Sequence, residues 1–167
     1  DMPGHSRSSI SAMEARYRKY MEKEMLDKAS EFRLIDPEDK TQYSSIQYYS
    51  DNTLNVCLDS TYHFIDTVMD NVKAIHEAAN HPLTRYHIGA DETAGAWKES
   101  PACHKLLANN PFGLKTIKDL GPYFIERVAS ILDKKGIEVA AWSDGLEHVT
   151  PEKMPKVVQA NAWVPLQ

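Results

Sequence analysis

Short apolar segments alternate with amphipathic helical segments along this chain, and the alternation limits the folds open to it. Apolar side chains recur at helical spacing over about residues 9–33, 61–79 and 121–135, with a shorter helix expected over 102–109. Compact apolar runs bounded by breaker residues predict strands over 84–90, 137–142 and 156–163. This order is typical of a parallel sheet built from right-handed βαβ units. We therefore expect an α/β fold.

Local signals predict where some of these elements begin and end. Asp59 and Ser60 are good N-cap residues for the second long helix, because a short side-chain oxygen can accept a hydrogen bond from a free backbone N–H. Gly136 is placed to stop the third long helix. Trp97 is expected to anchor the loop in which it lies.

The overall composition favours a globular chain and excludes several classes of function. A hydrophobic content of 42% suffices for an ordinary core, and a net charge of -5 argues against a nucleic-acid partner. The sequence holds no apolar run long enough for a membrane span and no signal-like N-terminus. Cys57 and Cys103 are too few and too far apart for a zinc ribbon, although one disulfide is possible. The chain begins at Asp1 without an initiator methionine, so we expect a piece of a longer protein.

Asp91 and Glu92 are the best catalytic candidates, because they follow the strand expected over 84–90. Neighbouring strand residues point to opposite faces, so both carboxylates can face one pocket only if the strand ends there and the backbone turns. Gly89 allows close backbone approach just before the pair. Like charges this close favour one protonated carboxyl, which could serve as a general acid. Adjacent carboxylates are also common on surfaces, so the pair alone does not establish chemistry.

Chemically distinctive residues follow each expected strand. Asp91 and Glu92 follow the first strand, Trp142 and Trp163 follow the next two, and His5 would follow a strand just before the N-terminus. In a (β/α)8 barrel the reacting groups lie at the carboxyl ends of the strands, so these residues are expected to share one mouth. We therefore predict the central portion of a TIM barrel, incomplete, with about three of its eight strands.

Each of these residues also has a purely structural interpretation. Trp142 and Trp163 could cap the core as readily as they line a ligand wall, and His5 could be a hydrogen-bonding loop residue. His87 is placed by strand alternation on the same face as Asp91, so a supporting role is favoured over a reacting one.

The polar segment over residues 42–55 is rich in tyrosine. Tyr43, Tyr48 and Tyr49 could line a sugar site, but packing against the neighbouring helix is the favoured interpretation because aromatic side chains are usually buried.

Four motifs together resemble a known family. They are Asp1-Met-Pro-Gly-His5, His87-Ile-Gly-Ala-Asp-Glu92, Ala141-Trp-Ser-Asp144 and Gln159-Ala-Asn-Ala-Trp163. The combination resembles the β-N-acetylhexosaminidases of glycoside hydrolase family 20, above all the bacterial chitobiases. The family usually has Gly-Gly before the carboxylate pair, where this chain has Gly89-Ala90. The resemblance implies that residues 1–167 are a fragment of a single glycoside hydrolase catalytic barrel.

The resemblance also implies a retaining, substrate-assisted hydrolysis of terminal N-acetyl-D-hexosamine from chitobiose and chitin oligosaccharides, in which the substrate's acetamido oxygen is the nucleophile. Glu92 would be the general acid and then the base. Asp91 would orient the acetamido group and stabilise the cation that forms on it.

The remaining implied site residues support these two. His5, with Asp1 behind it, would tune the acid, and Trp142 and Trp163 would form apolar walls around the sugar. No metal and no cofactor are implied. The implied partners are N-acetylglucosamine-containing oligosaccharides, and the implied location is periplasmic, cell-envelope or secreted.

The family's sugar-binding arginine after the first strand is missing, and so are the site motifs of the last strands, so we expect the isolated chain to be inactive. One alternative is a non-catalytic saccharide-binding fragment, which would keep the tryptophans without needing Glu92. Another is a metal-dependent barrel hydrolase with His5, His87 and Asp91 as ligands, although the close-spaced histidine pair typical of such sites is absent.

Overall fold

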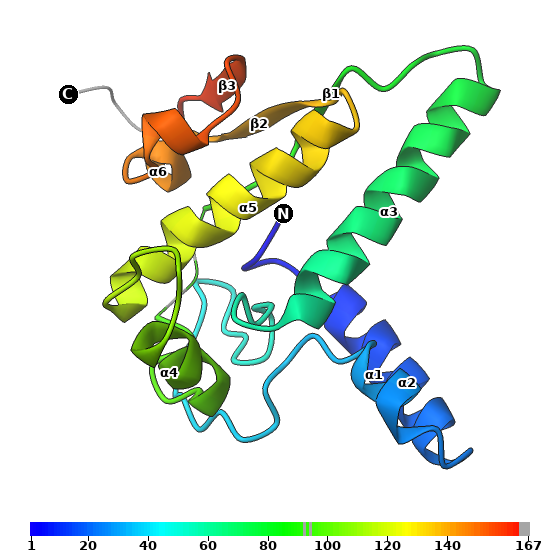
Figure 1. Cartoon of the computed structure of the whole chain (residues 1–167), viewed down its shortest axis with the longest axis vertical. Helices are drawn as coiled ribbons and strands as arrows, with labels where there is room; N and C mark the ends of the chain where they lie inside the picture. The colour runs from blue at the N-terminus through cyan, green and yellow to red at the C-terminus, as the bar shows by residue number, and fades with distance from the viewer. Residues whose placement is uncertain (92, 94, 164–167) are drawn as a thin grey trace.

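A computed structural model describes residues 1–91, 93 and 95–163 of the chain. In chain order its helices and strands are α1 (Arg7–Met21), α2 (Leu26–Ser30), α3 (Asp59–Ala78), β1 (Arg85–His87), α4 (Pro101–Ala108), η1 (Ile117–Asp119), α5 (Leu120–Lys134), β2 (Glu138–Trp142), α6 (Ser143–Leu146), η2 (Pro151–Lys153) and β3 (Val158–Asn161). The strands lie together at one side, with α5 across them and the α1–α2 pair at the far end (Figure 1). None of the helices described is both long and apolar enough to cross a bilayer.

The strands form a three-stranded parallel sheet in the order β1-β2-β3. His87 pairs with Ala140 and Trp142 pairs with Asn161, so the carboxyl ends of the strands lie at one edge. The N-terminal segment adds to the sheet through a parallel bridge between Met2 and Gly89. His5 therefore follows a short extended segment that lies next to β1, whereas the strand predicted just before the N-terminus stays a prediction.

Helix α5 supplies much of the core, because its apolar face packs on β2. Its residues Phe124, Val128 and Leu132 are fully buried, and Val139 of β2 is buried against the same core. Burial of a side chain of this size stabilises the fold by roughly 1.5–3 kcal/mol. Gly136 has a φ of 72°, which an L side chain rarely adopts, and it ends the helix as expected.

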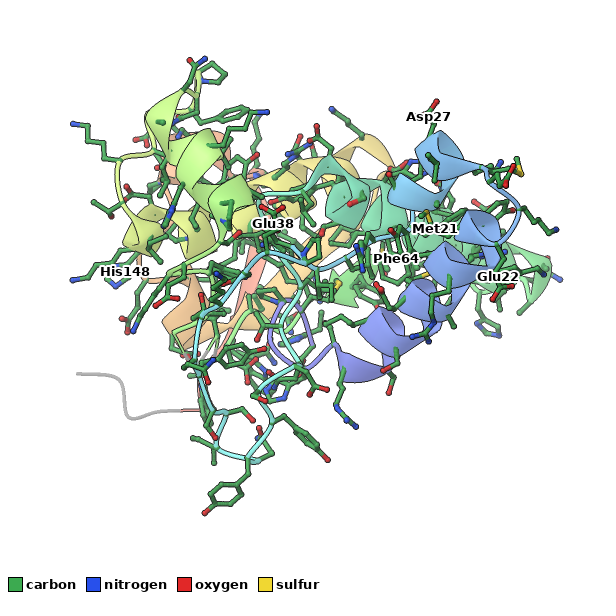
Figure 2. All side chains as sticks on the ribbon, turned by 90° about the horizontal axis from the view of Figure 1, so that it is seen from below. Met21, Glu22, Asp27, Glu38, Phe64 and His148 are labelled. Atoms are coloured by element: carbon green, nitrogen blue, oxygen red, sulfur yellow. A yellow bond between two sulfur atoms is a disulfide. The ribbon has the colours of Figure 1, made fainter. Side chains whose placement is uncertain are left out.

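The expectation of one helix over residues 9–33 is wrong, because the chain breaks between α1 and α2. Glu24 adopts a φ of 56°, and α2 turns back along α1. The turn lets the Phe32 ring stack on Tyr20 with centroids 5.0 Å apart. In one straight helix these residues would be about 18 Å apart at 1.5 Å per residue. Packing between the two segments therefore overrides the helical pattern. Figure 2 shows the pair with Met21, Glu22 and Asp27 labelled.

The start of α3 also differs from the expectation. Asp59 is the first residue of the helix, and Leu58 holds the cap position without a side-chain cap bond. The Ser60 hydroxyl donates to the Arg33 carbonyl oxygen, which fixes α3 to the end of the α1–α2 pair. Ser60 thus makes a tertiary contact and does not cap the helix.

The two cysteines are joined in a disulfide. Cys57 and Cys103 have Cα atoms 5.1 Å apart and are separated by 46 residues in sequence. The bond ties the segment before α3 to α4, which follows the loop that carries Asp91. The possibility that the sequence left open is thereby answered.

Candidate active site

The backbone turns sharply where β1 ends. Gly89 and Ala90 have φ values of 85° and 65°, so the strand alternation stops at His87 and Asp91 leaves the sheet direction. A Cβ on Gly89 would lie 2.5 Å from the Asp1 carboxylate and 2.7 Å from the Asp1 Cα. The close approach expected at Gly89 is confirmed. It brings the N-terminal segment directly against the turn.

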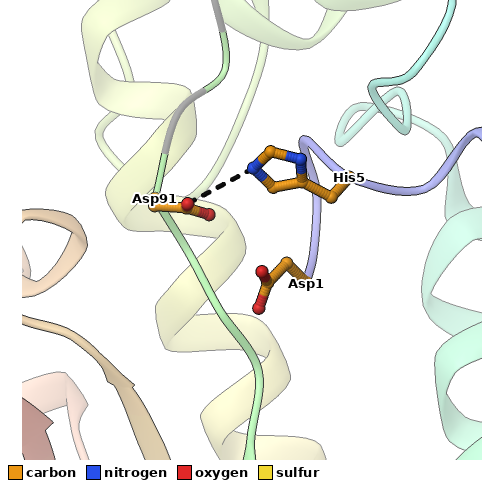
Figure 3. A group of neighbouring side chains, drawn as sticks. All are labelled: Asp1, His5 and Asp91. Carbon is orange, nitrogen blue, oxygen red and sulfur yellow. Dashed lines mark hydrogen bonds and ion pairs between the residues drawn. The ribbon is translucent and has the colours of Figure 1, made fainter. Parts of the chain in front are cut away.

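Asp91 lies next to His5 where the N-terminal segment contacts the turn after β1 (Figure 3). The His5 Nε2 and Asp91 Oδ2 atoms are 3.3 Å apart, and the side chains are 28% and 13% exposed. The Asp1 carboxylate lies close by, so that one potential ligand atom from each of the three residues falls within 4.8 Å of the others. Asp1, His5 and Asp91 are therefore brought together as the sequence predicted. Glu92 lies outside the described residues.

Three buried side-chain polar atoms lack hydrogen-bond partners within the part of the chain that the structure describes. They are Asp91 Oδ1, His87 Nε2 and Ser143 Oγ. Each belongs to the carboxyl end of β1 or β2 or to the residues just beyond it. Buried polar groups are nearly always paired, so three at one end of a sheet mark a place where a polar ligand can complete their bonding. Sequence reasoning did not single out Ser143.

An aromatic wall lies beside β1 on the β2 and β3 side. The Trp142 and Trp163 rings have centroids 6.2 Å apart, and the Trp163 indole N–H donates to Asp144 Oδ1 at 2.9 Å. Trp163 is 54% exposed, so its ring is not part of the core. The ligand-wall and core-cap interpretations stay predictions for both tryptophans.

His87 lies against Trp142 and does not join the Asp91 group. Its ring meets Trp142 edge to face at 4.7 Å between centroids. Its Nδ1 accepts the Gly89 backbone N–H at 3.1 Å, which leaves the proton of a neutral ring on Nε2. The placement of His87 on the Asp91 face by alternation is wrong, because two positive-φ residues intervene.

Among the described residues, the group that could hold a metal is Asp1, His5 and Asp91. The alternative ligand set of His5, His87 and Asp91 is not brought together. His5 and Asp91 are already within hydrogen-bonding distance of each other, which is the arrangement of a histidine that orients a carboxylate.

One central segment supports both loops of the site. The Ser6 N–H donates to the Asn52 carbonyl oxygen, and the Leu54 N–H donates to that of Pro3. The Trp97 indole N–H donates to the Leu54 carbonyl oxygen at 2.9 Å. The His5 loop and the Asp91 loop therefore rest on the same backbone. The loop-anchoring role predicted for Trp97 is confirmed.

A second anchor lies where the Asp91 loop enters α4. Asp36 accepts hydrogen bonds from the Ser100 hydroxyl at 2.6 Å and from the Ala102 N–H at 2.9 Å. The Asn55 side-chain amide donates to the same Ser100 oxygen at 3.0 Å. Burial alone would raise the pKa of Asp36, but these hydrogen bonds and one from the Glu38 N–H hold it below its ordinary value. No sequence signal joined these distant residues.

The whole chain, residues 1–167, matches the family described as glycosyl hydrolase family 20, catalytic domain. The chain belongs to this family. The beta-hexosaminidase B of Pseudoalteromonas piscicida is 56% identical over 161 residues, which cover 96% of this chain and 20% of that protein. The N,N'-diacetylchitobiase of Vibrio harveyi is 34% identical and is matched over 98% of this chain and 22% of its own length.

A solved structure of the family has the same arrangement. The exo β-N-acetylglucosaminidase of Vibrio harveyi, in complex with N-acetylglucosamine, superimposes with a TM-score of 0.74 at 31% identity. The match covers 99% of this chain and 22% of that one. The chain thus spans about a fifth of the length of its relatives in this family. Family 20 catalytic domains are TIM barrels, so the three parallel strands are part of a barrel, as the sequence predicted.

Proposed function

We propose that this chain is part of a β-N-acetylhexosaminidase that removes terminal non-reducing N-acetyl-D-hexosamine from chitobiose and chitin oligosaccharides. Membership of the family supports this, as do relatives named as beta-hexosaminidases and a chitobiase. The observation that carries the proposal is the state of the Asp91 carboxylate, in which one oxygen contacts His5 and the other is buried with no hydrogen-bond partner among the described residues.

The proposed reaction is retaining and uses the substrate's own 2-acetamido group. The acetamido carbonyl oxygen bonds to the anomeric carbon as the glycosidic C–O bond breaks, and Glu92 gives its proton to the leaving oxygen. The product of this step is a cyclic oxazolinium ion. Glu92 then takes a proton from water, whose oxygen attacks the anomeric carbon and reopens the ring. The sugar is released with its original configuration.

Asp91 supplies the orientation that this reaction needs. Its Oδ1 atom is available to accept the acetamido N–H, which turns the carbonyl oxygen towards the anomeric carbon. Its negative charge stabilises the oxazolinium cation. His5 holds the carboxylate through Oδ2, and Asp1 lies behind this pair.

The aromatic wall would hold the sugar. Trp142 and Trp163 offer apolar faces to the ring and the acetyl methyl group, and the Asp144 hydrogen bond fixes the angle of Trp163. None of these proposed steps requires a metal. We propose a supporting role for His87, whose ring packs edge to face against Trp142 and holds that side chain in place.

We also propose a periplasmic, cell-envelope or secreted location. The Cys57–Cys103 disulfide supports it, because such bonds persist mainly in oxidising compartments.

The mechanism can be tested on the complete protein with substrates whose acetamido group carries one, two or three fluorine atoms. Fluorine makes the carbonyl oxygen a poorer nucleophile, so kcat should fall steeply along the series. Proton NMR should show the β-anomer of the sugar as the first product. A flat series or an initial α-anomer would contradict substrate assistance with retention.

A further inference from the structure

A groove of about 380 Å³ opens beside His5 of the catalytic group. His5 lines the groove, and so do Arg7, Gln47, Tyr49 and Asn52. They come from the start of α1 and from the loop before α3. Its volume lies in the range of small-molecule sites, and its lining mixes an aromatic ring with amide and hydroxyl groups.

The tyrosine-rich loop does not pack as the sequence suggested. Tyr49 is 45% exposed and Tyr48 is 90% exposed, so neither ring is buried against a helix. Tyr43 alone is partly buried, and its hydroxyl accepts the Asn52 and Thr53 N–H groups. In Figure 2 the loop, coloured cyan, projects from the body of the molecule. Two exposed aromatic rings thus lie on a loop whose base is fixed.

Hydrogen bonds within the loop and a contact with Arg7 hold Tyr49 in place. The Ser45 N–H donates to the Tyr49 carbonyl oxygen at 2.8 Å, and the Ser45 hydroxyl accepts the Tyr49 N–H at 3.1 Å. Arg7 lies 5.1 Å from the Tyr49 ring centroid and is held there by Asp51, with Nε to Oδ1 at 2.8 Å. The ring is therefore set in place before any ligand arrives, which lowers the entropic cost of binding.

We propose that this groove binds the N-acetylglucosamine units on the leaving-group side of the cleaved bond. The inference rests on the proposed function and adds a second saccharide site to it. The N-terminal segment and β2 flank β1 on opposite edges, so the Trp142–Trp163 wall and the groove lie on opposite sides of Asp91. With the terminal sugar against the wall, the rest of the oligosaccharide extends past His5 into the groove.

The chemistry of the groove suits this ligand. A pyranose ring presents axial C–H groups that pack on an aromatic face, as Tyr49 can offer on the face of its ring that Arg7 does not cover. Its hydroxyl and acetamido groups need donors and acceptors, which Gln47 and Asn52 can supply. Arg7 is paired with Asp51, whose carboxylate offsets the guanidinium charge, so the groove does not strongly favour an anionic ligand over a neutral sugar.

The test compares two substrates of the complete protein, tri-N-acetylchitotriose and a small aryl N-acetylglucosaminide. Tyr49→Ala should lower kcat/KM for the trisaccharide by about tenfold, which corresponds to one aromatic contact, and leave the aryl substrate within about twofold. Tyr49→Phe should keep full activity on both. Gln47→Ala should reduce trisaccharide cleavage by roughly threefold.

Tyr48→Ala is the matched control, because it removes the same kind of ring from the same loop outside the groove. It should change neither substrate. Equal losses on both substrates in Tyr49→Ala, no loss on the trisaccharide, or the same selective loss in Tyr48→Ala would overturn the assignment. If the wild-type protein cleaves neither substrate, the proposed function itself fails, and this outcome is distinct from the others.

Discussion

The backbone carbonyl oxygen of Ala90 occupies the space where a side chain on Gly145 would begin. A Cβ on Gly145 would lie 1.9 Å from this oxygen. Ala90 precedes Asp91, and Gly145 lies in α6 directly after β2. The position of the turn between β1 and Asp91 thus depends on the absence of a side chain at Gly145, just after β2.

Gly145→Ala should therefore displace Ala90 and misplace Asp91. We expect kcat of the complete protein to fall at least tenfold, with a loss of about 1–3 kcal/mol in the free energy of unfolding from the forced backbone shift. Steady-state kinetics and chemical denaturation would measure the two effects. Gly121→Ala is the control, because a Cβ there meets nothing within 4 Å. An unchanged kcat in Gly145→Ala would show that the contact does not position the site.

The hydrogen bonds to Asp36 predict a pH dependence of stability. Because its folded-state pKa is lowered, its contribution is present above the unfolded-state pKa and is lost as the pH falls through the folded-state value. Asp36→Asn should cost about 1 kcal/mol at pH 7, a modest value because the carboxylate is partly exposed. The difference from wild type should shrink below about pH 4.

Urea denaturation at pH 7 and pH 3 would measure this change. Asp27→Asn, on an exposed position of α2, serves as the control and should show little difference at either pH. A destabilisation by Asp36→Asn that is equal at both pH values would show that the charge of Asp36 is not responsible.

Removal of the disulfide should destabilise the fold without touching the reacting groups. The double variant Cys57→Ala/Cys103→Ala should lose about 2–4 kcal/mol, because the unfolded chain regains the freedom of the closed loop. Thermal unfolding with and without a reductant would test this. The wild-type Tm should fall on reduction and the variant's should not. Equal reductant sensitivity in the two proteins would contradict the pairing.

The 167-residue polypeptide on its own should not turn over a chromogenic N-acetylglucosaminide. Within the described residues β3 is an edge strand of the sheet, and apolar side chains such as Ile75 (68% exposed) and Val157 (51% exposed) face solvent. Exposed edges and patches of this kind favour association over a fixed active geometry. The complete protein is the positive control. Measurable turnover by the short polypeptide would refute the prediction.

Much of the fold could be predicted because its signals are local. The apolar face of α5, the stop at Gly136 and the order of strands and helices all follow from periodicity and breaker residues. The position of the site at the strand ends followed from the parallel topology. Asp91 and His5 were brought together for that reason, without any sequence motif that joins them directly.

The unpredicted features depend on contacts between distant residues. The break between α1 and α2 is stabilised by the Tyr20–Phe32 stack, which no helical pattern reveals. The Ala90–Gly145 contact and the Asp36–Ser100 hydrogen bond join residues more than fifty positions apart in sequence. Tyr49 was predicted to pack against a helix because aromatic residues are buried on average, but its side chain is exposed. A ligand-binding function is one reason for an aromatic side chain to be exposed.

The most direct test of the account is the turnover number of Asp91→Asn and Glu92→Gln in the complete protein, with folding checked by circular dichroism. Loss of a general acid or of the group that orients the nucleophile should lower kcat on an oligosaccharide by about 10²–10⁴-fold in each variant. The same variants should still bind N-acetylglucosamine through the tryptophan wall. If either variant kept wild-type kcat, the assignment of catalysis to this pair would be wrong.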